Sequence, residues 1–227
     1  MKGGREKPWS LRSPILRYDA ESGSRREPFR MTTAGALDGQ TRRRLATRER
    51  LYEAAVALVT ERGYEAATID EIAVRAGTSR RTSFNHFPAK SEITLEWARR
   101  RRAEAAAAAA KAADSRSDVL DRVRAYFRAL AAITEERPAE TREMLLGYLR
   151  ACGPVSQPTP MSAELAALLA GDRGDSEKFR LAGEILYDVY AGVLWRWMRD
   201  PAPRQGAFTK ELVATIEVAL HGIAGLH

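Results

Sequence analysis

Apolar residues recur at the three- and four-residue spacing of amphipathic helices along most of the chain from residue 42 onward. Gly63, Gly77, Pro88 and the pair Gly153 and Pro154 stand where these segments stop, as helix-ending residues do. The pattern predicts helices over residues 42–62, 68–77, 79–87, 89–113, 117–137, 139–152, 163–169, 175–200 and 208–223. We therefore expect an all-α protein with about nine helices.

The second and third of these helices are short and are separated by a tight turn. Thr68 and Glu71 have the spacing of a capping box that starts the first of the two, and Ser79 is a favourable cap for the second. Two helices joined by so short a turn form a helix-turn-helix. Arg80 and Arg81 lie at the start of its second helix, where a protein that reads the DNA major groove carries its base contacts.

The positive charge of the chain is unevenly spread. The whole chain has a formal net charge of +7, to which residues 1–40 contribute +3, residues 41–102 contribute +6 and residues 103–227 contribute −2. A basic module joined to a slightly acidic one indicates that only the N-terminal half meets a polyanion.

Composition also limits where the protein works. Cys152 is the only cysteine, which excludes an internal disulfide and a thiolate metal cluster and suits a reducing cytosol. No apolar run approaches the roughly 20 residues of a membrane span, and the N-terminus lacks the apolar core of a signal peptide. We expect a cytoplasmic protein that does not enter a membrane.

Motifs of the common catalytic and cofactor sites are missing from the sequence. The histidines are His86, His221 and His227, and their spacing does not make a zinc site. The sequence contains no P-loop, no G-x-S-x-G and no G-x-G-x-x-G. We therefore expect no enzymatic activity, no cofactor and no bound metal.

The stretch from Thr68 to Lys90 resembles the tetracycline-repressor (TetR) family of transcriptional regulators. The positions that match the family's motif are Thr68, Ile69, Glu71, Ile72, Ala73, Ala76, Gly77, Ser79, Thr82, His86, Phe87 and Lys90. Three positions depart from it: Thr78 replaces the usual valine, Ser83 an apolar residue under the recognition helix, and Phe84 a tyrosine. We expect Ser83 to loosen that helix slightly. The resemblance implies an N-terminal helix-turn-helix domain followed by a helical domain that binds a ligand and dimerises.

The resemblance also implies roles for single residues. Base edges would be read by Arg80, Arg81, Thr82 and Phe84. Phosphates would be held by Thr68, Asn85, His86 and Lys90. A basic arm would consist of Arg42, Arg43, Arg44 and Arg48, which either add electrostatic attraction or enter the minor groove, unless they are a solvated disordered segment.

The helices after residue 90 are expected to regulate and to dimerise. A ligand cavity is implied by the resemblance, and its candidate lining is Trp97, Tyr126, Phe127, Met144, Tyr148, Phe179 and Tyr187, unless these are ordinary core residues. The apolar stripes of the last two helices are wider than one core requires, which predicts a subunit interface. Its expected residues are Val189, Val193, Trp197, Ile216 and Leu220. The four arginines at residues 99–102 are expected to form a solvated face.

These features predict a sequence-specific repressor that binds a near-palindromic operator as a homodimer and responds to a small-molecule effector. The alternative is an architectural DNA-binding protein without an effector, although the chain after residue 90 is much longer than dimerisation needs. We expect a disordered extension at residues 1–40, a DNA-binding domain at 41–90 and a regulatory domain at 91–227. Met31 precedes the structured part, and we hypothesise that translation starts there.

Overall fold

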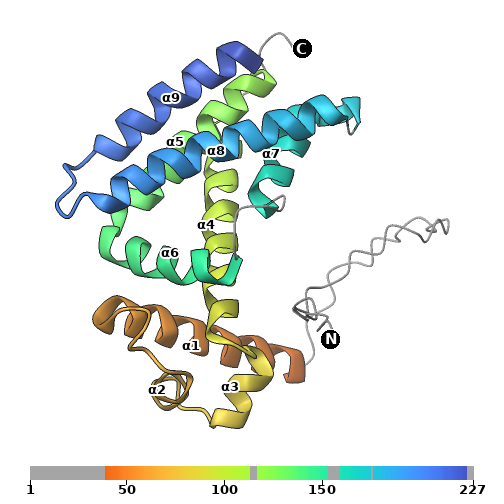
Figure 1. Ribbon diagram of the computed structural model, residues 1–227. Helices are drawn as coiled ribbons and strands as arrows, with labels where there is room; N and C mark the ends of the chain where they lie inside the picture. The colour runs from red at the N-terminus through yellow and green to blue at the C-terminus, as the bar shows by residue number, and fades with distance from the viewer. Residues whose placement is uncertain (1–38, 113–116, 153–158, 175, 224–227) are drawn as a thin grey trace, which may run out of the picture. The chain divides into compact units, whose positions relative to one another are not determined.

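The computed structural model describes residues 39–112, 117–152, 159–174 and 176–223, and every regular element in these ranges is helical (Figure 1). The helices are α1 (Gly39–Arg62), α2 (Ile69–Arg75), α3 (Arg80–His86), α4 (Lys90–Ala112), α5 (Val119–Glu136), α6 (Pro138–Cys152), α7 (Pro160–Ala170), α8 (Glu177–Arg199) and α9 (Ala207–Ile223), with a 3-10 turn at Gly171–Arg173. The all-α prediction is confirmed. Within these ranges no helix is long and apolar enough to cross a membrane. The extension up to residue 38, the start at Met31 and the stop at Gly153 and Pro154 lie outside the described residues.

Capping residues start the helices, mostly where the sequence predicted them. The Thr68 hydroxyl accepts a hydrogen bond from the Glu71 amide at 3.2 Å, and the Glu71 carboxylate accepts one from the Thr68 amide at 3.1 Å. Ser79 caps α3 through the Thr82 amide at 3.1 Å. α7 starts at Pro160 rather than at residue 163, because Thr159 caps it and proline is favourable in the first turn of a helix.

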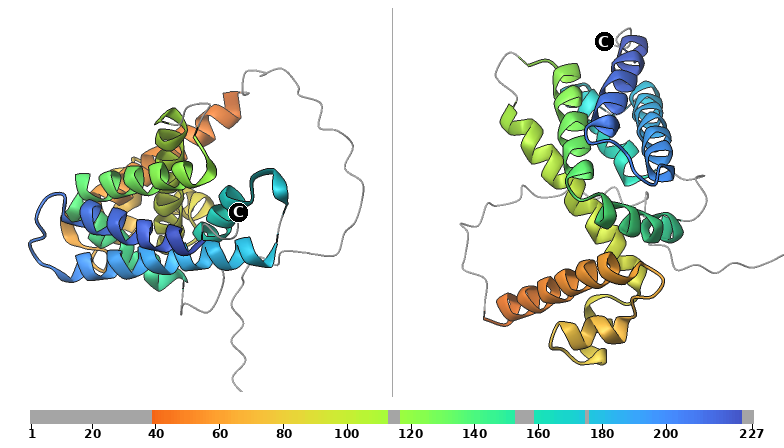
Figure 2. Two further views of the ribbon diagram at one scale, coloured as in Figure 1. Left: turned by 90° about the horizontal axis from the view of Figure 1, so that it is seen from above. Right: turned by 90° about the vertical axis from the view of Figure 1, so that its left-hand side faces the viewer.

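α4 joins two groups of helices (Figures 1 and 2). α1, α2 and α3 pack together near its N-terminal end. α5 packs along α4, α9 packs on α5 and α8, and α7 packs on α8. α6 contacts both α4 and α1, so it lies between the two groups. The helix-turn-helix is therefore connected to the later helices both by the continuous α4 and by the contact of α6 with α1.

A glycine permits close packing at the contact between these two groups. Gly147 of α6 is buried, and a Cβ atom at this position would lie 2.3 Å from the ring of Tyr64, which follows α1. Since that separation is far below van der Waals contact, only glycine permits so close an approach. The turn after α1 bends at Gly63, whose φ of 85° also favours glycine. Both glycines thus hold α6 against the end of α1.

Four of the five interface residues predicted on α8 and α9 are buried in the chain's own core, and the fifth, Val189, stays a prediction. Val193, Trp197, Ile216 and Leu220 are each 5% exposed or less, whereas Val189 contacts the same core but is only partly buried. Side chains without accessible surface have none to bury against a partner subunit, so the wide stripes belong to this chain's own core. The same two helices expose other large apolar side chains: Leu181 at 45%, Ile185 at 49%, Trp195 at 52% and Val218 at 74%.

Candidate functional site

The α3 helix buries one face and exposes the other. Ser83 is buried, as is Phe87 just after the helix, whereas Arg80, Arg81 and Phe84 are exposed. Phe84 keeps 38% of its surface accessible. Guanidinium groups match the acceptors of guanine in the major groove, and an aromatic ring can contact a thymine methyl group. The exposed face of α3 therefore carries three of the four side chains predicted to read bases.

The two arginines at the start of α3 have different surroundings. Arg80 donates to Asp70 of α2 at 2.8 Å, and its guanidinium carbon lies 5.4 Å from the centre of the Phe84 ring. Arg81 has no ion-pair or hydrogen-bond partner for its side chain among the described residues. Thr82, the fourth predicted base contact, is half-buried, and its hydroxyl lies 2.8 Å from that of Ser79. Arg81 is thus the side chain on this face that can bind an acceptor without first breaking a contact.

Two of the three departures from the family's motif lie against each other. The hydroxyl oxygen of Ser83, a buried residue, lies 3.1 Å from that of Thr78 and 3.3 Å from the Ser79 carbonyl oxygen. A buried hydroxyl costs little when its hydrogen bonds are made. Thr78 and Ser83 therefore form a polar contact where the family's motif has an apolar one, and this pairing opposes the loosening expected from Ser83 alone.

Two of the predicted phosphate-binding side chains lie on α3 itself, and Thr68 caps α2, where its hydroxyl donates to Glu71 at 2.8 Å. Thr68 and Asn85 are exposed, and His86 is half-buried at the end of the helix. Burial, together with the charges of Arg44 and Arg48, lowers the pKa of His86 below its ordinary value. Asn85, His86 and Arg44 line a surface hollow of about 340 Å³. These side chains together offer an anion both charge and hydrogen-bond donors.

Lys90, the fourth predicted phosphate contact, is directed into the protein. Its ammonium donates to the carbonyl oxygens of Tyr64, of Glu65 at 3.4 Å and of Ala67 at 2.8 Å, and lies 4.2 Å from the centre of the Tyr64 ring. Burial lowers its pKa. An ammonium has three N–H donors, and three carbonyl groups use them. Lys90 therefore fastens the loop between α1 and α2 to the start of α4, and a phosphate contact in addition is not available to it.

Lys90→Ala is expected to destabilise the fold rather than to remove a DNA charge. The substitution leaves three carbonyl groups without their donor, which we expect to cost about 1–3 kcal/mol of unfolding free energy. Denaturant unfolding followed by circular dichroism measures this loss, with Lys111→Ala at the exposed end of α4 as the control. Unchanged stability combined with a shallower salt dependence of DNA binding would restore the phosphate role.

The predicted basic arm consists of two unlike parts. Arg42, Arg43 and Arg44 are exposed on the first turns of α1, so they belong to a helix and not to a disordered segment. Arg48 is half-buried: it donates to the His86 carbonyl oxygen at 2.5 Å, and its guanidinium carbon lies 4.0 Å from the centre of the Phe87 ring. Arg48 is therefore a structural link between α1 and the end of α3. Its side chain is still 34% exposed and lines the same hollow as Arg44 and His86, so its part in the basic arm stays a prediction.

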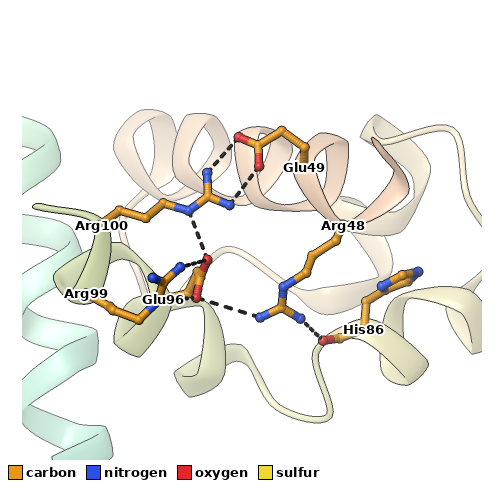
Figure 3. Close-up of polar contacts among 6 residues, drawn as sticks. All are labelled: Arg48, Glu49, His86, Glu96, Arg99 and Arg100. Atoms are coloured by element: carbon orange, nitrogen blue, oxygen red, sulfur yellow. Dashed lines mark hydrogen bonds and ion pairs between the residues drawn. The ribbon is translucent and has the colours of Figure 1, made fainter. Parts of the chain in front are cut away.

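Polar side chains join α1 to α4 (Figure 3). Arg100 donates to both carboxylate oxygens of Glu49, at 2.6 and 2.7 Å, and to Glu96 at 3.0 Å. Arg99 donates twice to the same Glu96, at 3.0 and 2.8 Å, and Arg48 lies 3.9 Å from it. The hydrogen bonds from Arg99, opposed by burial and reinforced by Arg100, lower the pKa of Glu96 to about 2. Because two-pronged guanidinium–carboxylate contacts are directional, this network fixes the orientation of α1 against α4.

The arginines at residues 99–102 do not form the solvated face that the sequence predicted. The Arg101 side chain is 12% exposed and donates to Glu140 of α6 at 2.5 Å and to the Ile133 carbonyl oxygen at 2.8 Å. Arg102 is 11% exposed and donates to Glu164 of α7 at 2.8 Å. Burial opposes ionisation of Glu140, but hydrogen bonds from Trp97 and Arg101 keep its pKa below the ordinary value. One turn of α4 therefore contacts α1, α5, α6 and α7.

A cavity of about 80 Å³ lies among α4, α5, α6, α7 and α8. Three of the seven candidates for a ligand cavity line it: Trp97, Tyr148 and Tyr187. The other four, Tyr126, Phe127, Met144 and Phe179, are buried core residues outside its wall. Lining residues that the sequence did not single out include Leu130, Leu145, Met161, Tyr190, Leu194 and Met198. The cavity exists where the resemblance implied it, with a lining that is only partly the expected one.

Residues 51–96 match the family model described as bacterial regulatory proteins, tetR family. No curated protein matches the chain in sequence. Among solved structures, FadR of Thermus thermophilus, a TetR family transcriptional repressor in complex with lauroyl-CoA, is 23% identical with a TM-score of 0.57, and the match covers 77% of this chain and 94% of that one. The SmeT–triclosan complex is 21% identical with a TM-score of 0.54, over 78% and 91% of the two chains. NalD, the secondary repressor of the MexAB-OprM multidrug efflux pump in Pseudomonas aeruginosa, is 18% identical with a TM-score of 0.52, over 80% and 97%.

Proposed function

We propose that this chain, which belongs to the tetR family of bacterial regulatory proteins, represses transcription by binding a near-palindromic operator as a homodimer. The observation that carries the proposal is the exposed face of α3, where Arg80, Arg81 and Phe84 project within the segment that matches the family model. A recognition helix with two guanidinium groups at its start suits guanine in the major groove. One such helix for each half-site gives the operator its two-fold symmetry.

Phosphate contacts would flank the recognition helix. Asn85 and His86 of α3 and Thr68 at the start of α2 are hydrogen-bonding groups, and the exposed Arg42, Arg43 and Arg44 supply positive charge from α1. Contacts to the backbone position a protein on DNA and carry most of the salt-dependent affinity. In this arrangement α3 recognises the base sequence, and the surrounding surface supplies affinity that does not depend on the sequence.

The homodimer would form through the outward faces of α8 and α9. Leu181, Ile185 and Trp195 of α8 and Val218 of α9 are large apolar side chains exposed on two helices that pack side by side. An exposed apolar surface of this kind is characteristic of a subunit contact. A two-fold axis would bring the same patch of both subunits together, which yields a bundle of four helices.

The effector would be a small molecule that binds the cavity among α4, α5, α6, α7 and α8. The similar structures support this proposal, because FadR is described in complex with lauroyl-CoA and SmeT in complex with triclosan. At about 80 Å³ the cavity is smaller than the roughly 300–1,000 Å³ of common ligand sites. The effector would therefore enlarge it, and release from the operator would follow from its preference for the enlarged state.

Operator binding is expected to weaken steeply with salt. An operator is first selected with the unliganded protein from a pool of random duplexes and is then titrated at several salt concentrations. If Arg42, Arg43 and Arg44 each neutralise one phosphate, the dimer neutralises six, and the log–log slope should be about −5. Replacing the three arginines by glutamine should make the slope shallower, whereas Arg122→Gln on the exposed side of α5 should leave it unchanged. A slope shallower than about −3, or a pool that yields no preferred duplex, contradicts the proposed function.

A further inference from the structure

The charged side chains that line the cavity have one sign. Among the residues that the structure describes, Arg101 and Arg102 are the charged members of its wall. The rest of the wall is mainly apolar and aromatic, with Leu130, Leu194 and Met198 as examples. A mainly apolar cavity with cationic groups at one place favours an anion that carries an apolar part.

The two arginines have used their hydrogen-bond donors to different extents. Arg101 is bound to Glu140 and to the Ile133 carbonyl oxygen. Arg102 donates only through Nε, to a Glu164 carboxylate that is itself 51% exposed. In the described part of the chain the two terminal amino groups of Arg102 have no acceptor, although the side chain is only 11% exposed. A guanidinium whose terminal donors have no protein acceptor is the arrangement that a carboxylate satisfies, since the two groups pair through two parallel hydrogen bonds.

A second polar group without a partner lies next to Arg102. Tyr126 is 6% exposed, and its hydroxyl is buried without a hydrogen-bond partner in the described part of the chain. Tyr126, Arg102 and Glu164 together line a groove of about 500 Å³ on the other side of Arg102, between α4, α5 and α7. Burial raises the pKa of Tyr126, so its hydroxyl keeps its proton and can donate. Arg102 belongs to the walls of both the cavity and the groove.

We propose that the effector is an amphipathic carboxylate, whose carboxyl group receives hydrogen bonds from the terminal amino groups of Arg102 and from the hydroxyl of Tyr126. Its short apolar chain occupies the cavity, and the groove is the way in. The proposal rests on the proposed function, because it names the class of ligand for that regulatory site. Glu164 and the carboxyl group of the ligand compete for the guanidinium of Arg102, so the ion pair with Glu164 weakens ligand binding.

The position of Arg102 also connects the ligand with the DNA-binding helices. Arg100, two residues earlier in α4, holds Glu49 of α1 through two hydrogen bonds. Arg101, between them, holds α6 through Glu140. A carboxylate that draws Arg102 away from Glu164 therefore acts within one turn of the contacts that orient α1. Occupation of the cavity is expected to change operator affinity through this part of α4.

The test uses the full-length protein without DNA and the probes butyrate, hexanoate and octanoate, with hexan-1-ol and octan-1-ol as uncharged controls. Calorimetric titration should give a dissociation constant at least tenfold lower for the best carboxylate than for the alcohol of the same chain length. Arg102→Gln should weaken carboxylate binding about tenfold or more and leave alcohol binding unchanged. Glu164→Gln should strengthen carboxylate binding severalfold, because it removes the competing charge. Arg128→Gln, on the exposed side of α5, is the control with unchanged binding.

Tyr126→Phe separates the ligand site from the stability of the fold. Its hydroxyl makes no hydrogen bond to any residue that the structure describes, so the variant should keep its melting temperature while it loses carboxylate affinity severalfold. Equal binding of carboxylates and alcohols, no binding of either, or unchanged carboxylate binding by Arg102→Gln overturns the proposal. Operator binding by the unliganded protein is measured separately. A protein that selects an operator but fails the carboxylate test thus keeps its function as a repressor and loses only this ligand class.

Discussion

A protein with both Ile185→Glu and Val218→Glu is expected to fold as a monomer and to lose tight operator binding. Both side chains are exposed, at 49% and 74%, so a carboxylate in their place remains hydrated in the single chain. Two facing copies would bring like charges into an apolar contact, which opposes association. Since a monomer engages one half-site only, operator affinity should fall by roughly 10²–10⁴, the usual gain from joining two binding events.

The matched control places the same charge at a buried position of α8. Val193 is fully buried, so Val193→Glu puts an unpaired carboxylate into the chain's own core and should unfold the protein. Sedimentation measures the mass of each variant, and circular dichroism measures its helix content. The expected result is a helical monomer for the double variant and lost helix content for Val193→Glu. Two outcomes would contradict the proposed interface: a double variant that stays dimeric, or a Val193→Glu protein that is a folded monomer. Either would instead favour the interface residues predicted from the sequence.

The error over α8 and α9 shows what periodicity can and cannot reveal. Helical spacing of apolar residues correctly predicted that both helices have wide apolar surfaces. It does not reveal which part of a wide surface faces the same chain, because a neighbouring helix and a second subunit would impose the same chemical requirement. Val193 and Ile185 are both apolar residues of one helix, and only the positions of the helices packed on α8, namely α7 and α9, make one of them core and the other surface.

Local chemistry was the most predictable part of the fold. The caps at Thr68 and Ser79 depend on residues three positions away, and the structure has both. The fold class followed from the same signals. The candidate site was less predictable, because the sequence does not show in which direction a long side chain extends. Lys90 lies at the position of a phosphate-binding lysine in the family's motif, but here its four-carbon stem lets the ammonium reach the carbonyl groups that end the loop after α1.

Ion pairs between distant residues were beyond sequence analysis for a related reason. Arg100 and Glu96 stand four residues apart on one helix, which is a recognisable spacing. Glu49 and Glu164 reach the arginines of α4 from α1 and α7, and no spacing rule relates residues on separate helices. The run of arginines therefore indicated a solvated surface. In the folded chain most of these arginines instead link α4 to other helices. The pairing of Thr78 with Ser83 was recognisable in principle, since five residues separate them across a known turn.

Arg81→Ala is expected to give the largest loss of sequence discrimination among changes on α3. Its side chain is exposed and makes no hydrogen bond among the described residues, so its whole guanidinium fork is available to guanine. We expect a cost of about 1–3 kcal/mol for each half-site, hence about 2–6 kcal/mol for the dimer, with relaxed preference at one symmetric base position. Arg80→Ala should cost less, because Arg80 must first give up its contact with Asp70.

Arg81→Lys distinguishes reading from adhesion, because it keeps the positive charge but not the planar fork. Each variant is titrated against the selected operator and a scrambled duplex at several salt concentrations. Arg81→Lys should lose most of the operator affinity that Arg81→Ala loses, while its affinity for the scrambled duplex and its salt slope stay those of the unaltered protein. If Arg81→Lys instead binds the operator as well as the unaltered protein does, Arg81 acts only as a charge near the backbone, and base reading must lie with Arg80 and Phe84.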